Sequence, residues 1–138
     1  VGSLLNHSEH RLEFILMSKI FKQMKLEKLK IILCCENLVE ARKFLKLRPF
    51  GIAFEDKKLI GSWKSITQFK SGDVKKFADI LRDTEIKSLC GAGVSTAEDV
   101  LTAFDLGCEG VLISSAIANS SERKVEKLLR DIARIRKV

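Results

Sequence analysis

The chain has 138 residues, of which 46% are apolar and 31% are charged. This balance is typical of a folded globular domain and excludes a chain that is disordered by composition. A run of about 18 apolar residues, the length that a membrane-spanning helix needs, does not occur, and the sequence does not open with the pattern of a secretion leader. We therefore expect a cytoplasmic protein without a membrane partner.

The net charge of +7 arises from 25 Lys and Arg against 18 Asp and Glu. The excess is spread along predicted helices, which is typical of a solvated face and favours anionic ligands in general. Because aromatic residues are not interleaved with the basic ones, we do not expect a nucleic-acid partner. The four cysteines lack the spacing of a metal site and lie in or beside apolar runs, so we interpret them as small buried hydrophobic residues. These are Cys34, Cys35, Cys90 and Cys108.

The first half of the chain predicts two strands, each followed by a helix. Residues 1–5 form the first apolar run and end in a polar cluster. A stripe of apolar residues then recurs at helical spacing, as in a helix that packs on a sheet. Its members are Leu12, Ile15, Leu16, Ile20, Phe21 and Met24. Residues 29–35 are nearly all apolar, as in a strand that is covered on both faces. Asn37, with Glu40 three residues later, predicts the start of a second helix, which extends to Leu47.

The second half continues the alternation. Residues 50–55 predict a strand that ends in the carboxylate of Glu55, and residues 56–70 lack a clear period and predict a long mobile loop, which in compact domains is usually functional. Further helices are expected at residues 74–81, 95–106 and 125–135, with strands at residues 86–90 and 110–113. Ser95 and Glu98 suggest a capping box at the start of the middle helix, and Gly107 is expected to end it.

Five β-α units thus account for residues 1–138 as a single domain with a parallel sheet. In such folds the functional residues follow the carboxyl ends of the strands. Two of these ends carry proton-handling side chains, His7 and Glu55. Two others are small-residue turns of the kind that let backbone N–H groups approach a phosphate: the glycine turn, residues 91–93, and the serine turn, Ser114 and Ser115. Taken singly, each feature is also common in structural roles.

Four segments resemble, in chain order, the triosephosphate isomerase family of the short archaeal type. They are residues 4–11 (LLNHSEHR), residues 53–61 (AFE followed by LIG), residues 89–100 (LCGAGVSTAEDV) and residues 110–115 (GVLISS). The first is similar to the family's fourth strand, the second to its catalytic-Glu strand and flexible lid, and the last two to its phosphate turns after strands seven and eight. The resemblance implies a partial (β/α)8 TIM barrel, comprising strands four to eight.

The resemblance also implies an activity and a set of roles. The family interconverts dihydroxyacetone phosphate and glyceraldehyde 3-phosphate, in glycolysis and gluconeogenesis, without a cofactor or a metal. Glu55 would be the general base, and His7, held neutral at a helix N-terminus, would polarise the substrate carbonyl. Supporting residues would be Asn6, Ser8 and Glu9. The residues implied to bind the substrate phosphate are Gly61, Gly91, Ala92, Gly93, Ser114 and Ser115.

The chain departs from the family pattern at the lid and at the front of the barrel. Asp56 follows the base where the family usually has Pro, and the lid tip reads Gly61-Ser62-Trp63 where Gly-Thr-Gly is common. The family's first three strands, with a substrate-contacting Lys, have no counterpart, so we expect an N-terminal segment or chain as a partner, and a homo-oligomer of the complete enzyme. Two alternatives stay open: a non-catalytic half-barrel subunit, and another phosphate-binding β-α barrel enzyme, which would not need His7 and Glu55 together.

Overall fold

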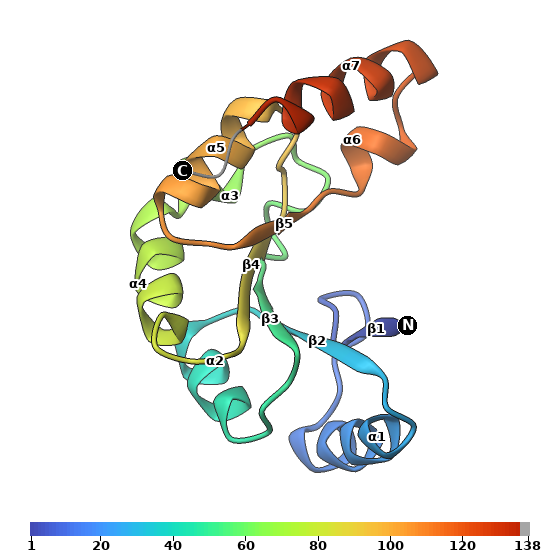
Figure 1. Cartoon of the computed structure of the whole chain (residues 1–138), viewed down its shortest axis with the longest axis vertical. Coiled ribbons are helices and arrows are strands. Elements are labelled where there is room, and N and C mark those ends of the chain that lie inside the picture. Colours follow the sequence, from blue (N-terminus) through green and yellow to red (C-terminus); the bar gives the residue numbers. More distant parts are fainter. Residues whose placement is uncertain (136–138) are drawn as a thin grey trace.

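Five parallel strands form one sheet, and their order in space follows their order in the chain. The structure is a computed structural model that describes residues 1–135. The strands are β1 (Gly2–Leu5), β2 (Lys30–Cys35), β3 (Gly51–Phe54), β4 (Lys87–Gly91) and β5 (Gly110–Leu112). In Figure 1 the sheet follows an arc, with most helices along its outer side and the concave side open. This is the arrangement of five consecutive units of a (β/α)8 barrel, as predicted from the sequence.

The helices are α1 (Phe14–Leu26), α2 (Leu38–Leu45), α3 (Ile66–Phe69), α4 (Ser71–Leu81), α5 (Ala97–Asp105), α6 (Ser115–Ala118) and α7 (Glu122–Ala133). Helices α1 to α5 lie between successive strands along the convex side of the sheet, and α6 and α7 follow β5 (Figure 1). Within the described residues, none of these helices is long and apolar enough to cross a membrane.

The core lies between the sheet and the helices. Because successive side chains of a strand point to opposite faces, Leu33 of β2 is fully buried against the helices whereas its neighbour Ile32 is partly exposed on the concave side. The rings of Phe54 on β3 and Phe77 on α4 stack with centroids 5.5 Å apart and anchor the middle of this layer. Phe54 is also the register partner of Cys35 on β2, so the segments that follow β2 and β3 leave the sheet at one edge.

The buried face of α1 differs from the predicted stripe. Met17 and Phe21 are the buried residues of this helix, whereas Ile15 and Leu16 are 73% and 49% exposed. The helix begins only at Phe14, after an irregular segment, and it rests on β2 through the face that carries Met17 and Phe21. Phe21 and Met24 of the predicted stripe do contact the core. A spacing of four residues drifts around a helix that has 3.6 residues per turn, so Ile15 and Leu16 fall outside the buried face.

Two segments predicted to be irregular contain short helices, and one cap lies a residue later than expected. The predicted loop of residues 56–70 includes α3, and the small-residue turn at 114–116 opens α6. The capping box of α5 pairs Thr96 with Asp99, not Ser95 with Glu98. Gly107, with a φ of +99°, follows the C-cap of α5 and ends the helix as predicted.

Candidate active site

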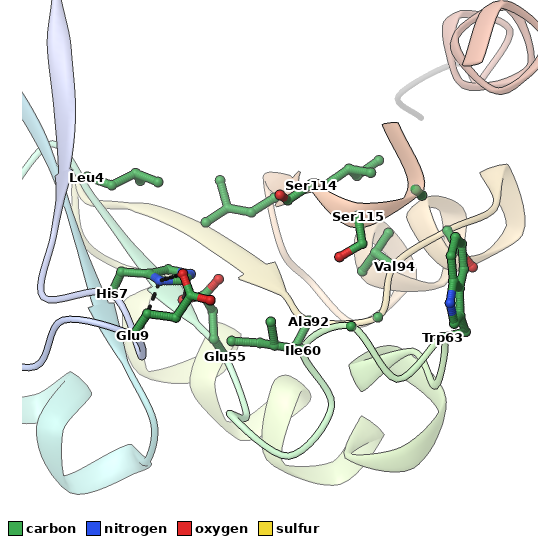
Figure 2. A pocket seen from close by; sticks show the side chains of 16 residues that line it. Leu4, His7, Glu9, Glu55, Ile60, Trp63, Ala92, Val94, Ser114 and Ser115 are labelled. Atoms are coloured by element: carbon green, nitrogen blue, oxygen red, sulfur yellow. Dashed lines mark hydrogen bonds and ion pairs between the residues drawn. The ribbon is translucent and has the colours of Figure 1, made fainter. Parts of the chain in front are cut away.

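His7 and Glu55 meet at the carboxyl edge of the sheet. Glu55 directly follows β3, and its N–H donates to the carbonyl of Cys35 at 2.9 Å, which fixes the backbone at the strand end. His7 follows β1 in a turn closed by a hydrogen bond from the N–H of His10 to the His7 carbonyl at 2.8 Å. The Nε2 atom of His7 lies 3.5 Å from Oε2 of Glu55 (Figure 2).

Glu55 is a buried carboxylate with spare hydrogen-bonding capacity. Its side chain is 5% exposed, and within residues 1–135 its Oε2 has no hydrogen-bond partner. Burial raises the pKa of Glu55, an effect that the nearby His7 imidazole and a hydrogen bond from the Cys34 thiol only partly offset. A carboxylate whose pKa is raised towards neutrality, with one oxygen left to accept a proton, has the properties of a general base.

The hydrogen bond at the other imidazole nitrogen assigns the tautomer of His7. The N–H of Glu9 points at Nδ1 of His7 at a distance of 3.4 Å, so Nδ1 acts as an acceptor. In the neutral imidazole the proton then resides on Nε2, the nitrogen that faces Glu55. His7 does not lie at a helix N-terminus as expected, because α1 begins seven residues later, at Phe14. A turn, and not the end of a helix, thus places Nε2 of His7 beside the Glu55 carboxylate.

Asn6 holds this turn to the neighbouring strand. Its Nδ2 donates to the carbonyl of Cys34 at 3.1 Å, and its Oδ1 accepts the N–H of Leu12 at 2.9 Å. With a φ of +66°, Asn6 adopts the left-handed conformation that Asn tolerates better than most residues. Asn6 therefore holds the turn that carries His7, and its supporting role in the site stays a prediction.

Ser8 and Glu9 have contrasting surroundings. Ser8 is buried, and within the described part of the chain its hydroxyl has no hydrogen-bond partner. The Glu9 side chain is 72% exposed, and its carboxylate lies 3.6 Å from Nδ1 of His7. Both residues thus adjoin His7 without closing a hydrogen-bond network around it.

A cavity of about 400 Å³ extends from the His7–Glu55 pair to the two small-residue turns. In Figure 2 the pair lies at one end, and Ala92, Ser114 and Ser115 lie towards the other. The predicted site residues that line the cavity are His7, Glu9, Glu55, Gly61, Ala92, Gly93, Ser114 and Ser115. The predicted residues Asn6, Ser8 and Gly91 are not among its lining residues.

Gly91 lies behind Glu55. A Cβ atom added at Gly91 would come within 3.1 Å of Oε1 of Glu55 and 3.0 Å of Cβ of Leu112. These distances are tighter than most real contacts, so glycine at this position leaves the space that the Glu55 carboxylate occupies. The structure thus places Gly91 against the carboxylate, whereas the next two residues of the glycine turn reach the cavity.

The far end of the cavity combines two turns and a loop. Ala92 and Gly93 have φ angles of +83° and +70°, so the glycine turn is built from two successive left-handed residues. Opposite, the serine turn opens α6, whose N-cap Ser114 makes no side-chain cap hydrogen bond. The segment between Glu55 and α3, residues 56–65, is called the lid loop here, and it contributes Ile60, Gly61 and Trp63 to the lining. Backbone N–H groups exposed at turns of this kind can bind an anion.

Sequence reasoning missed a partner of the site, Cys34. All four cysteines are buried and free, as expected. Cys34 is nevertheless more than a small hydrophobic residue, because its thiol, whose pKa burial raises well above the usual range, donates a hydrogen bond to Glu55. Its place at the carboxyl end of the strand beside the Glu55 strand would have suggested this contact. Within the described residues, no cluster of His, Cys, Asp and Glu could hold a metal ion.

Solved structures that resemble this one share its fold. The structure named "Native KDPGal structure" superimposes with a TM-score of 0.64 at 17% identity, covering 84% of this chain and 52% of that one. The crystal structure of mandelate oxidase with benzoyl-formic acid gives a TM-score of 0.63 at 17% identity, covering 84% of this chain and 36% of that one. Together with the site at the carboxyl ends of the strands, these likenesses define the class as a β/α-barrel protein.

Sequence relatives narrow this class to one family. The family model described as triosephosphate isomerase matches residues 1–134. The triosephosphate isomerase of Thermoplasma volcanium is 35% identical over 132 residues, which are 94% of this chain and 62% of the relative. That of Methanosarcina barkeri is 38% identical over 136 residues, 94% of this chain and 60% of the relative. The chain belongs to the triosephosphate isomerase family, and it spans about three fifths of the length of these relatives.

Proposed function

We propose that this chain supplies the catalytic base, the electrophile and the phosphate site of a triosephosphate isomerase that interconverts dihydroxyacetone phosphate and glyceraldehyde 3-phosphate. One observation carries the proposal. The Nε2 atom of His7 lies 3.5 Å from the unpartnered oxygen of the buried Glu55, at one end of a cavity whose other end is lined by the glycine turn and the serine turn. The reaction needs a base, an electrophile and a phosphate site that one three-carbon phosphate can contact at the same time.

The proposed chemistry is a proton transfer between neighbouring carbons. The Glu55 carboxylate removes a proton from C1 of dihydroxyacetone phosphate, and the electrons of the C–H bond move to form an enediolate whose charge develops on the C2 oxygen. The His7 Nε2–H donates a hydrogen bond to this oxygen, which stabilises charge that appears only as the reaction proceeds. The proton of the C1 hydroxyl then passes to the C2 oxygen, which leaves the negative charge on the C1 oxygen. The protonated Glu55 returns its proton to C2 while the C1–O bond becomes the aldehyde C=O, and glyceraldehyde 3-phosphate results.

The phosphate would be held between the glycine turn and the serine turn, beneath the lid loop. Small residues there let backbone N–H groups approach the ligand closely, and a closed lid would exclude water from the enediolate. Gly93 is unsuited to a substitution test, because a side chain there would collide with the lid loop. Ser114→Asp is more informative, since Ser114 is exposed and lines the cavity. The added charge should abolish inhibition by a phosphate-bearing analogue.

The proposal includes a partner. An eight-stranded barrel needs three strands besides the five seen here. The concave side of the sheet carries apolar side chains, such as Leu4, which is 45% exposed. A segment that supplies the first three strands and the substrate-contacting Lys would cover this face, and the complete enzyme would work as a homo-oligomer in the cytoplasm. The chain without that segment is expected to lack isomerase activity.

The test uses the assembled enzyme, which is this chain together with the segment that completes the barrel. Glu55→Gln should lower kcat by about 10²–10⁴-fold, the usual contribution of a positioned base, and His7→Gln by about 10²–10³-fold. The chain offers matched controls: His10→Gln and Glu85→Gln change the same residue types at exposed positions outside the cavity. Near-normal turnover of Glu55→Gln would contradict the assignment of the base.

Features of the lid loop favour a second candidate function, that of a non-catalytic half-barrel subunit. Trp63 at the lid tip has a φ of +61°, which is strained for a bulky residue, and Asp56 stands at the hinge. A coupled isomerase assay on the assembled protein separates the two candidates. A folded, complete barrel that binds a phosphate-bearing analogue but shows no turnover would support the non-catalytic role.

A further inference from the structure

One buried carboxylate joins two segments that both reach the cavity. Asp99, near the start of α5, is 2% exposed. Its Oδ2 accepts the N–H groups of Ser95 and Thr96, both at 3.0 Å, and so organises the chain just after the glycine turn. Its Oδ1 accepts Nε2 of Gln68 at 3.0 Å. Gln68 lies on α3, directly after the lid loop, so this bond connects residues that are 31 positions apart in the sequence.

The backbones of the same two segments touch beside this bond. The N–H of Ile66, the first residue of α3, donates to the carbonyl of Ala92 at 3.0 Å. A Cβ atom added at Gly93 would lie 2.0 Å from the carbonyl oxygen of Lys64. The end of the lid loop therefore rests directly on the glycine turn, and the bond between Gln68 and Asp99 is one side-chain link that accompanies this contact.

The two residues differ in what they do for stability. Although burial alone would raise the pKa of Asp99, hydrogen bonds from Ser95, Thr96 and Ser65 outweigh this effect and hold its pKa below the usual range. Asp99 is therefore a charged acceptor whose main partners belong to the helix cap. Gln68 is an exposed residue that takes no part in that cap. Its side chain can be changed while both cap hydrogen bonds of Asp99 remain.

We propose that Gln68 and Asp99 are positioning residues that hold the C-terminal end of the lid loop against the glycine turn, so that a bound phosphate meets both at once. The inference rests on the proposed function, because it concerns the phosphate of the same substrate. The lid loop and the glycine turn line the cavity together through Gly61, Trp63, Ala92 and Gly93. A ligand that needs donors from two segments binds well only when their separation is fixed to a fraction of an ångström.

The central experiment is Gln68→Met in the assembled enzyme, which removes the donor and keeps the length of the side chain. We expect KM for the triose phosphate and the inhibition constant of a phosphate-bearing analogue to rise about 10-fold, with kcat reduced far less, because binding to the phosphate is what the bond supports. Proton exchange in D-glyceraldehyde, the same aldose without a phosphate, should stay unchanged. The melting temperature should match that of Gln23→Met, a control at an exposed position on α1.

A rescue variant and an activity-independent measurement complete the design. Gln68→Lys restores a donor that can reach Asp99, and it should bring KM back towards the wild-type value. Amide exchange at residues 61–66 and 92–95 should be faster in Gln68→Met than in Gln23→Met. Unchanged KM, inhibition and exchange in Gln68→Met would overturn the positioning role while leaving the proposed function intact. If the wild-type assembly has no isomerase activity, the proposed function fails, and the exchange comparison still decides whether the two residues fix the lid loop.

Discussion

The carboxylate of Asp56, the first residue of the lid loop, lies 3.4 Å from Nζ of Lys70, the residue after α3. An ion pair thus joins the first residue of the lid loop to the residue that follows α3. The Asp56 carboxylate also accepts the N–H of Lys58 at 2.8 Å, which shapes the first turn of the loop. Where the family usually has a proline, whose ring restricts the backbone, this chain has Asp56, which restrains the hinge through its ion pair and its hydrogen bond.

Removing the ion pair should loosen the start of the lid loop without unfolding the protein. An ion pair with a half-exposed lysine contributes at most about 1 kcal/mol, so Lys70→Met should change the free energy of unfolding only slightly. Amide exchange at residues 56–60 should become faster. The control is Lys75→Met, because Lys75 pairs with Asp79 within α4 at 3.9 Å and does not touch the loop. Equal exchange in the two variants would contradict the restraint.

The raised pKa of Glu55 predicts that the base destabilises the folded protein. A carboxyl group whose pKa is higher in the folded state costs stability when it is charged, at pH values above its folded pKa. The cost vanishes as the pH falls below the unfolded value of about 4.3. Glu55→Gln should therefore melt at a higher temperature than the wild type near pH 7, and the difference should disappear near pH 4. Thermal unfolding of both proteins at pH 7 and pH 4 measures the effect, and a difference that persists at pH 4 would contradict it.

The lowered pKa of Asp99 predicts that its contribution to the free energy of unfolding depends on pH in the opposite way. Its pKa is lowered in the folded state, so its contribution to stability is fully present above the unfolded value of about 3.9 and is lost as the pH falls through the folded pKa. Asp99→Asn should lower the free energy of unfolding by about 1–3 kcal/mol at pH 7, because buried cap donors lose their charged acceptor. Urea unfolding at pH 7 and pH 3 measures the effect. A deficit that is the same at both pH values would contradict the role of the charge.

Gly61 and Gly93 have the same φ angle but differ in the space around a Cβ atom, so substituting each one distinguishes the cost of backbone strain from the cost of a steric clash. Gly61 and Gly93 both have a φ of +70°, but a Cβ atom at Gly61 would meet nothing within 4 Å, whereas at Gly93 it would lie 2.0 Å from the Lys64 carbonyl oxygen. Gly61→Ala should cost about 1–2 kcal/mol from the left-handed conformation alone. Gly93→Ala should cost about 1–3 kcal/mol more, because the lid loop must move. Chemical unfolding of both variants tests this ranking, and equal losses would refute it.

The sequence was informative where local chemistry determines the structure. The alternation of strands and helices, the turn at Gly107 and the start of α2 at Asn37, whose side chain accepts the N–H of Glu40, follow from nearest-neighbour patterns and were predicted. The stripe of α1 was right at Phe21 and Met24 and wrong at Ile15 and Leu16, because only the packing of the sheet determines which side of an apolar helix is buried. Ile15 and Leu16 are apolar and exposed, and composition cannot distinguish them from Met17.

Parts of the site also depended on contacts between distant segments. His7 and Glu55 could be proposed because each follows a strand, but the tautomer of His7 depends on a neighbouring N–H. The bond between Cys34 and Glu55 depends on the register of β2 against β3, and the bond between Gln68 and Asp99 depends on the packing of α3 against α5. No local pattern around Gln68 indicates its partner. The capping box was misplaced by one residue because Ser95 and Thr96 are both good N-caps, and the burial of Asp99 decides between them.

Trp63 is the only tryptophan of the chain, it is 56% exposed, and it lines the cavity from the lid loop. Its indole therefore gives this chain a single optical probe, located where a ligand would enter. In the free state it should emit at the long wavelengths of an indole in water. Closure of the loop over a bound phosphate ester should shift the emission to shorter wavelengths, so that occupancy of the cavity could be followed in real time without any added label.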